Sequence, residues 1–149
     1  MSAVPALSEL ESYLRDKIPL ARAMGVRVEA GGSSGMLVLT APLEPNHNHL
    51  GTAFGGSLSA VATLAAYALL WVELGDRTAH IVVHRSEIVY HRAVRGEIRA
   101  ICRRPPEAEL AEFRRQFAAT GKARIRLGAT IEHAGRVCVD FAGDFVALR

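Results

Sequence analysis

The sequence predicts an α+β protein in which an antiparallel sheet of about six strands wraps around one long central helix, with a further helix at the N-terminus. Residues 45–72 contain no Asp, Glu, Lys or Arg, and residues 55–74, most of which fall in this stretch, have the composition of an apolar helix. A helix that is apolar on all sides is expected to be buried on all sides. Two strand patterns precede it and four follow it, and a curled sheet could cover it.

Length and composition fit one domain over residues 1–149. The chain is 50% hydrophobic and 22% charged, which is enough for a core without disulfides or a structural metal. The 18 basic residues exceed the 15 acidic ones by only three, so we expect no nucleic-acid partner. Cys102 and Cys138 form no paired spacing, and no signal-peptide pattern is seen, so we expect a cytoplasmic protein.

The 20-residue uncharged run at 53–72 also raises the question of a membrane span, because about 20 residues suffice to cross a bilayer. It opens with Gly, Ser and Thr and relies on weakly hydrophobic Ala. We therefore expect no membrane partner and assign the stretch to the protein core.

The N-terminal segment has apolar residues at helical spacing, namely Leu7, Leu10, Leu14 and Ile18. Ser8 and Glu11 have the form of a capping box. Pro19 should break the helix, with one further turn possible up to Met24 before Gly25.

The strand patterns fall on both sides of the central helix. Residues 26–30 and 36–41 should form a hairpin around a turn at 31–35, followed by a polar loop at 46–53. Four further strands are expected at residues 79–92, 96–103, 122–133 and 137–145, with a helical excursion at 107–119. A sheet of this size leaves its edge strands open, so we expect a homo-oligomer, a dimer or a dimer of dimers.

Two stretches carry a family resemblance: residues 48–58, Asn-His-Leu-Gly-Thr-Ala-Phe-Gly-Gly-Ser-Leu, and residues 88–97, Ile-Val-Tyr-His-Arg-Ala-Val-Arg-Gly-Glu. They resemble hotdog-fold thioesterases, most closely the YiiD C-terminal-like family, over most of residues 25–147. The resemblance implies hydrolysis of acyl thioesters and a role for Asn48, Gly55 and Gly56. Many such enzymes have His where this chain has Phe54, and Asp or Glu, the nucleophile or general base, where it has Thr63.

The start of the central helix offers a carbonyl site. Amides in a first helical turn lack partners and bear partial positive charge, and the pair Gly55 and Gly56 lets a thioester carbonyl approach the backbone closely. The alternative is that the glycines serve only close packing. Asn48 and Thr63 are candidates for positioning water, and Ser59, Thr63 and Tyr67 share one helix face. Equally, these hydroxyls could bond back to the preceding helical turn.

A general base must then come from elsewhere. Glu87 is our candidate, with His84, His91 and His49 as others, since a dimer could bring a partner strand to the helix start. By strand alternation Glu87 more often faces the surface. If the resemblance holds, the acyl chain lies in an apolar crevice, and the substrate-binding candidates are His49, Phe54, Ser57, Leu58, Ser59 and Tyr67.

No cofactor is expected. His80 and His84 on one strand are about 13 Å apart, too far for one metal ion. His47 and His49 lack further ligands at a recognisable spacing, so we expect no metal. Arginines near strand ends could contact coenzyme A or phosphopantetheine phosphates, or could simply be solvated: Arg92, Arg95, Arg103 and Arg104.

The resulting hypothesis is a thioesterase acting on acyl-coenzyme A or acyl-carrier-protein substrates. A non-hydrolytic acyl-thioester binding protein is the main alternative, since the helix lacks a catalytic acid. A hydroxyacyl-thioester dehydratase would use His47 or His49 with an acid.

Overall fold

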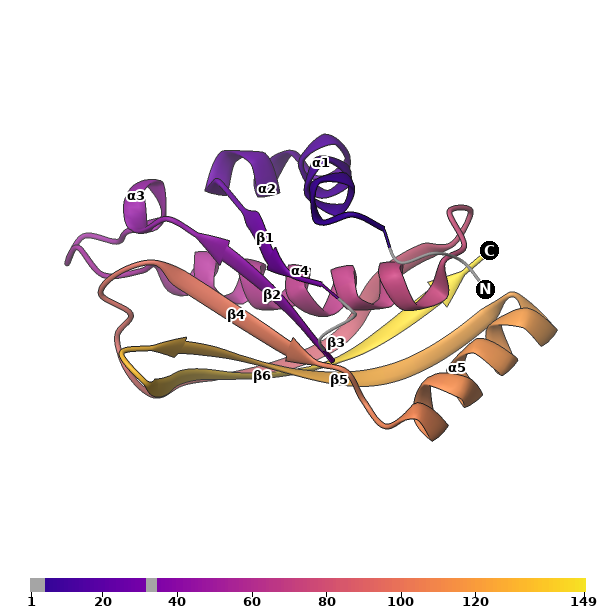
Figure 1. Ribbon diagram of the computed structural model, residues 1–149. Coiled ribbons are helices and arrows are strands. Elements are labelled where there is room, and N and C mark those ends of the chain that lie inside the picture. Colours follow the sequence, from indigo (N-terminus) through magenta and orange to yellow (C-terminus); the bar gives the residue numbers. More distant parts are fainter. Residues whose placement is uncertain (1–4, 32–34) are drawn as a thin grey trace.

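A computed structural model describes residues 5–31 and 35–149 and confirms the α+β architecture (Figure 1). Its six strands form one antiparallel sheet in the order β1-β2-β4-β5-β6-β3. Their bounds are β1 Arg27–Ala30, β2 Met36–Ala41, β3 His80–Tyr90, β4 Ile98–Arg103, β5 Lys122–His133 and β6 Arg136–Leu148. The hairpin of β1 and β2 is confirmed by their pairing, but the turn expected at 31–35 falls largely outside the described residues.

The helices lie mostly on one side of this sheet. They are α1 Leu7–Lys17, α2 Pro19–Met24, the single turn α3 Leu43–Asn46, α4 Gly55–Leu74 and α5 Glu107–Thr120. Figure 1 shows the sheet curling around α4, with α1 and α2 on the side of α4 away from β5 and β6. The core forms where the apolar residues of α4 meet the inner face of the sheet, which includes Leu39, Leu127 and Phe145.

Local sequence explains most of these boundaries. Along β5 buried and exposed residues alternate from Lys122 to Ala129, as expected for a strand with one covered face. Pro19 begins α2, where its missing amide donor costs nothing, and Gly25 ends it in the left-handed conformation at φ 74°.

The expected capping box at the start of α1 is wrong. Ala6 is the N-cap residue, and no side chain caps the helix. The Glu11 carboxylate instead accepts a hydrogen bond from the backbone amide of Val28 at 2.9 Å, so it joins α1 to β1. A tertiary contact has replaced the local one.

Helix α5 covers a part of β5 that β4 does not reach. β4 pairs with β5 only from Ala100 to Cys102, opposite Ala129 to Ile131. Over the rest of β5 the edge is exposed to α5, which packs there through Leu110, Phe113 and Phe117. Covering a strand edge with a helix protects it from pairing with another chain.

The expectation that α4 is buried on all sides is only partly correct. Ten of its residues are buried, but the line Gly55, Ser59, Thr63 and Tyr67 is half-buried. By length and mean hydropathy, 1.6 over its most apolar window, α4 could cross a membrane, yet 56% of that window is buried within the protein. This burial is typical of the core helix of a globular fold. Along this half-open line, the rest of the chain covers α4 only in part.

Strand β3 forms one edge of the sheet and is exposed along nearly its whole length. Only Ile81 is buried, whereas Val82, Val83, Val89 and Tyr90 are large exposed apolar residues. An 11-residue exposed edge strand with apolar side chains near both ends is a template for pairing with a second chain. β3 packs against α4, and its residues Ile81 and Val83 line the same cavity as Thr63 and Tyr67 of the half-open line.

Candidate active site

The loop before α4 is fixed at both ends by hydrogen bonds from side-chain and backbone amides. Asn46 is buried, and its side-chain amide donates to the carbonyl oxygens of Met24 and Pro42, each at 2.8 Å. Its own carbonyl oxygen accepts from the amide of Phe54 at 2.7 Å. Next to this, the amide of Ala53 donates to the Val94 carbonyl oxygen at 2.8 Å. The first turn of α4 is therefore held between the chain after β2 and the chain after β3.

The Asn48 side chain forms its hydrogen bonds within this loop. Its Oδ1 atom accepts from the amides of Leu50 and Thr52, and its Nδ2 atom donates to Thr52 Oγ1 at 2.9 Å. The structure thus places Asn48 where it shapes the loop, and only one of its two side-chain N–H groups remains free for a ligand. His49, in the same turn, is exposed.

The N-terminus of α4 is accessible and flanked by two aromatic rings. Helix geometry leaves the amides of Gly55, Gly56 and Ser57 without intrahelical acceptors. Phe54 is 56% exposed, and a Cβ atom at Gly56 would lie 2.5 Å from its ring. The Tyr90 hydroxyl donates to the Gly55 carbonyl oxygen at 3.2 Å. These free amides and the partial positive charge of the helix end can stabilise an oxyanion.

A cavity of about 450 Å³ lies along the half-open line of α4. Three layers line it: Leu20 and Met24 from α2, Thr63 and Tyr67 from α4, and Val83 and Phe145 from β3 and β6. Its volume is in the range of small-molecule sites, and its lining is mostly apolar. Thr63 is two helical turns beyond Gly56, about 10 Å along the axis, and Ala60 is the residue of the cavity wall nearest in sequence to the start of α4.

Hydroxyl groups give this cavity a few polar atoms, each with a partner. The Thr63 hydroxyl donates to the Ser59 carbonyl oxygen at 2.8 Å, the back-bonded arrangement foreseen as an alternative. It can still accept a hydrogen bond from water. The Tyr67 and Tyr13 hydroxyls are 2.9 Å apart. Burial, and then this hydrogen bond, raise the pKa of Tyr67 well above its ordinary value. Ser57 and Ser59 are half-buried, and Leu58 is buried.

Glu87 is not brought to the helix start within the chain. It pairs in register with Ala142, whereas the neighbouring Ile88 pairs with the buried Phe141, so Glu87 faces away from α4. Its side chain is 72% exposed and lies 3.8 Å from Arg126.

Two other candidate bases also lie away from the helix start. His91 bonds Asp140 at 2.8 Å, and Asp140 is exposed beside the inward-facing Phe141. His84 is exposed at an irregularity of β3 between Val83 and Arg85. Over the described residues, no group of three or more His, Cys, Asp or Glu side chains is placed to hold a metal ion.

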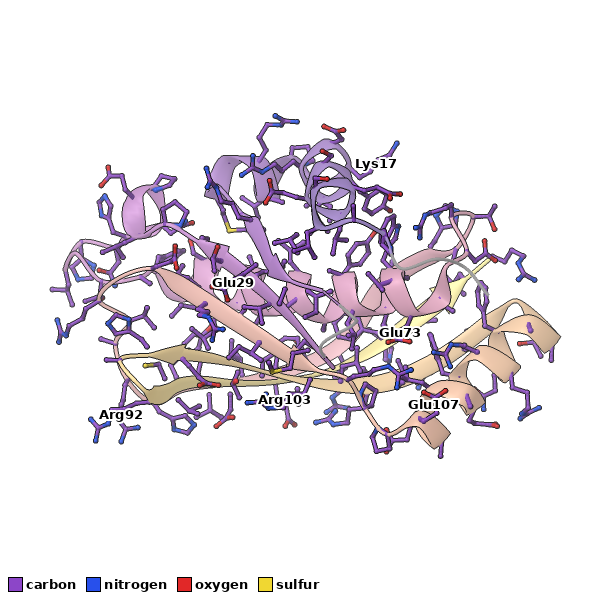
Figure 2. All side chains as sticks on the ribbon, viewed as in Figure 1. Lys17, Glu29, Glu73, Arg92, Arg103 and Glu107 are labelled. Atoms are coloured by element: carbon purple, nitrogen blue, oxygen red, sulfur yellow. The ribbon has the colours of Figure 1, made fainter. Side chains whose placement is uncertain are left out.

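The four candidate arginines divide into two pairs. Arg103 and Arg104 lie toward the α5 end of the sheet, where Arg104 binds Glu73 at 2.6 Å and Arg103 is 3.9 Å from Glu132. Arg92 and Arg95 lie at the other end, in the segment after Tyr90 that is bonded to the loop before α4. Figure 2 shows Arg92 at the opposite end of the molecule from Glu73 and Glu107.

Comparison with known proteins identifies the family. The family model described as "Putative thioesterase (yiiD_Cterm)" matches residues 7–149, nearly the whole chain. This chain belongs to that family. A family with this fold is consistent with the curled sheet around α4, so the fold expected from the resemblance is confirmed.

Solved structures agree with this assignment. A protein of unknown function from Chlorobaculum tepidum TLS is 36% identical, with a TM-score of 0.87, over 95% of this chain and 93% of that one. A "putative thioesterase" from Shewanella oneidensis is 25% identical, with a TM-score of 0.82, over 96% and 97%. PA5026 from Pseudomonas aeruginosa, titled a "probable thioesterase", shares the fold at 24% identity and a TM-score of 0.81, over 99% of each chain.

Sequence reasoning missed several residues of this family member's site. Asn46 is the buried anchor of the loop, yet its only sequence signal was a polar residue just after Pro45. Tyr90 was noticed as part of a motif but not placed at the helix start. The cavity wall from α2, Leu20 and Met24, had no signal, because contacts between distant segments leave no mark in a single sequence.

Proposed function

We propose that this chain hydrolyses acyl thioesters carried on coenzyme A or an acyl carrier protein. The thioester carbonyl lies against the free amides at the start of α4, and the acyl chain extends along α4 into the cavity lined by Thr63 and Tyr67. The amides stabilise the negative charge that develops on the carbonyl oxygen when water attacks. Family membership supports the reaction class.

One arrangement supports this assignment most strongly: α4 begins with free amides and, from Ala60 onward, forms one wall of an apolar cavity. Gly55 also has room for a Cβ atom, whose nearest neighbour would be the Tyr90 ring at 3.6 Å. Its φ is not positive, so neither packing nor backbone conformation requires glycine there. A glycine at this position leaves the backbone amides open to close approach by a ligand.

The proposed active form is a homodimer, or a dimer of dimers, joined through β3. Pairing of this edge with a second copy would cover its exposed valines and the half-open line of α4. It would also close the cavity, because Ile81 and Val83 of β3 form part of its wall. A partner could then supply the general base that α4 lacks, with Glu87 and His84 as the candidates on β3.

A non-hydrolytic binding protein is the second candidate, and the chemistry of α4 favours it. The helix has no acidic, basic or histidine side chain before Glu73. The hydroxyl of Thr63 is already a donor within the helix. Such a helix can hold an acyl thioester without activating water.

Thiol release from a panel of acyl-coenzyme A esters of increasing length, in parallel with calorimetric binding, separates the two candidates. The proposal expects turnover that falls in Thr63→Ala and Asn48→Ala, both checked for unchanged folding by circular dichroism. Saturable binding without thiol release would support the binding protein instead. Neither binding nor turnover with any ester, coenzyme A or carrier-bound, would contradict both functions.

A further inference from the structure

We propose that Arg92 and Arg95 bind the phosphate that ends the pantetheine arm of the substrate. This inference rests on the proposed function, because it assigns the far end of the same thioester substrate. It separates these two residues from the other arginines of the chain and gives the substrate a direction across the molecule.

Arg92 and Arg95 lie in a segment that is hydrogen-bonded to the start of α4. Arg92 follows Tyr90 by two residues, and the Tyr90 hydroxyl bonds the Gly55 carbonyl oxygen. Arg95 follows Val94, whose carbonyl oxygen accepts from the amide of Ala53 at 2.8 Å. Both arginines therefore belong to the segment that is joined to the start of α4. The backbone of Arg92 lies at most roughly 7 Å from that of Tyr90, and the lengths of the Tyr90 and Arg92 side chains add to the separation between the guanidinium group and the helix start.

The charges of Arg92 and Arg95 are available to a ligand. Arg92 and Arg95 are exposed, and neither has an ion-pair partner within the described residues. Asp140, across the ladder from Val89, is occupied by His91. Glu97, next but one to Arg95, lines a separate pocket with Arg15 and Arg27. By contrast, Arg104 and Arg114 at the far end of the sheet are neutralised by Glu73 and Glu107.

The proposed substrates carry their phosphate at a distance from the thioester. Coenzyme A and the prosthetic group of carrier proteins share a phosphate that a long pantetheine arm separates from the thioester. With the carbonyl at the start of α4 and the acyl chain in the cavity beyond it, the arm must leave on the side opposite the cavity. The segment carrying Arg92 and Arg95 follows the end of β3 that bonds the start of α4, whereas the cavity is lined by Ile81 and Val83 near the other end of β3. Guanidinium groups bind phosphate oxygens through paired, charge-assisted hydrogen bonds.

The test compares substrates that share one acyl group: acyl-coenzyme A, acyl-phosphopantetheine, acyl-carrier protein and acyl-pantetheine, which lacks the phosphate. The variants are Arg92→Gln, Arg95→Gln and the double variant. The control is Arg124→Gln, an exposed arginine seven residues along β5 from Ile131, about 23 Å toward the other end of the sheet.

We expect the double variant to raise KM about tenfold or more for the phosphate-bearing substrates, at unchanged kcat, a modest loss for two exposed charge-assisted contacts. KM for acyl-pantetheine should stay unchanged, as should every value for Arg124→Gln. Loss with acyl-carrier protein as well as acyl-coenzyme A supports recognition of the shared phosphate. Loss with acyl-coenzyme A alone overturns that claim, because it assigns the arginines to the nucleotide part.

An equal rise in KM for acyl-pantetheine would also overturn the inference, since it would mean a general effect on the site. Unchanged KM for all substrates in the double variant would overturn it while leaving the thioesterase function intact. Absence of turnover with every substrate in the unmodified protein would instead contradict the proposed function. Calorimetry with coenzyme A and pantetheine then tests the arginines alone, with weaker coenzyme A binding expected in the double variant and equal binding contradicting it.

Discussion

Gly55 has space for a methyl group and is still a glycine, in contrast to its neighbour. At Gly56 a Cβ atom would meet the exposed Phe54 ring at 2.5 Å, so a side chain there requires that ring to move. An alanine at Gly56 therefore has a neighbour to displace, whereas an alanine at Gly55 has none.

Gly55→Ala should keep the fold and lose activity. Alanine removes backbone freedom from the unfolded chain and favours helix, so stability should stay equal or rise by a few tenths of a kcal/mol. The added methyl hinders approach of the carbonyl, and we expect kcat/KM for acyl thioesters to fall at least tenfold, within the cost of losing one oxyanion donor. Thermal melting and thiol release measure both. A lowered melting temperature with normal activity would contradict the assignment.

Gly56→Ala makes the matched comparison. The Phe54 ring is exposed and can rotate away, so this variant should fold. Its crystal structure should show Phe54 displaced from the first turn of α4. An unmoved ring would mean that the close contact does not exist in the protein.

Tyr67 predicts a dependence of stability on alkaline pH. Its pKa is raised by burial and by the Tyr13 hydroxyl, so the folded state holds the phenol proton more tightly than the unfolded state. Stability is then fully present below the ordinary tyrosine pKa of about 10 and falls as the pH rises above it. Urea unfolding of Tyr67→Phe from pH 8 to 11 should show a shallower decline than the unmodified protein. Parallel curves would contradict this.

At the scale of elements, α5 is attached to α4 by a cluster of charges. The Glu73 carboxylate, with a side chain only 10% exposed, binds Arg104 and Arg114, each at 2.6 Å. Hydrogen bonds from Arg104 and then Arg114 also hold the pKa of Glu107 below its ordinary value. This cluster fixes the helix that protects the free edge of β5.

Glu73→Gln should therefore destabilise the protein by roughly 2 kcal/mol, because two guanidinium groups lose their shared charge partner in a nearly buried position. Hydrogen exchange should increase first in α5 and the adjoining part of β5. Glu109→Gln is the control, since Glu109 is exposed on the same helix. Equal stability of both variants would show that the cluster does not anchor α5.

The elements themselves were largely predictable, and their surroundings were not. The uncharged run places α4 at residues 55–74, and alternation marks β5 at 122–133, because both patterns record burial directly. The same uncharged run could not show that the line through Thr63 is half-open. A residue covered by a second subunit and one covered by its own chain have the same composition. Likewise, the partners of Asn48 depend on the loop's three-dimensional path.

At the scale of the whole molecule, the exposed edge of β3 supports the proposed self-association. The double variant Val82→Lys, Val89→Lys adds charges to two exposed valines, so it should leave the isolated chain folded. Light scattering after size exclusion should show the unmodified protein as a dimer or tetramer and this variant as a smaller species with reduced thioesterase activity. A monomeric, fully active unmodified protein would contradict the dimeric site.

The most direct measurement is a crystal structure with an acyl-coenzyme A analogue in which a methylene group replaces the thioester sulfur. The analogue keeps the carbonyl but cannot be hydrolysed. The account predicts the carbonyl oxygen about 3 Å from the amides at the start of α4, the contact distance of an oxyanion site. The acyl chain should fill the cavity beside Thr63 and Tyr67. A carbonyl bound away from those amides, with the cavity unoccupied by the acyl chain, would contradict it.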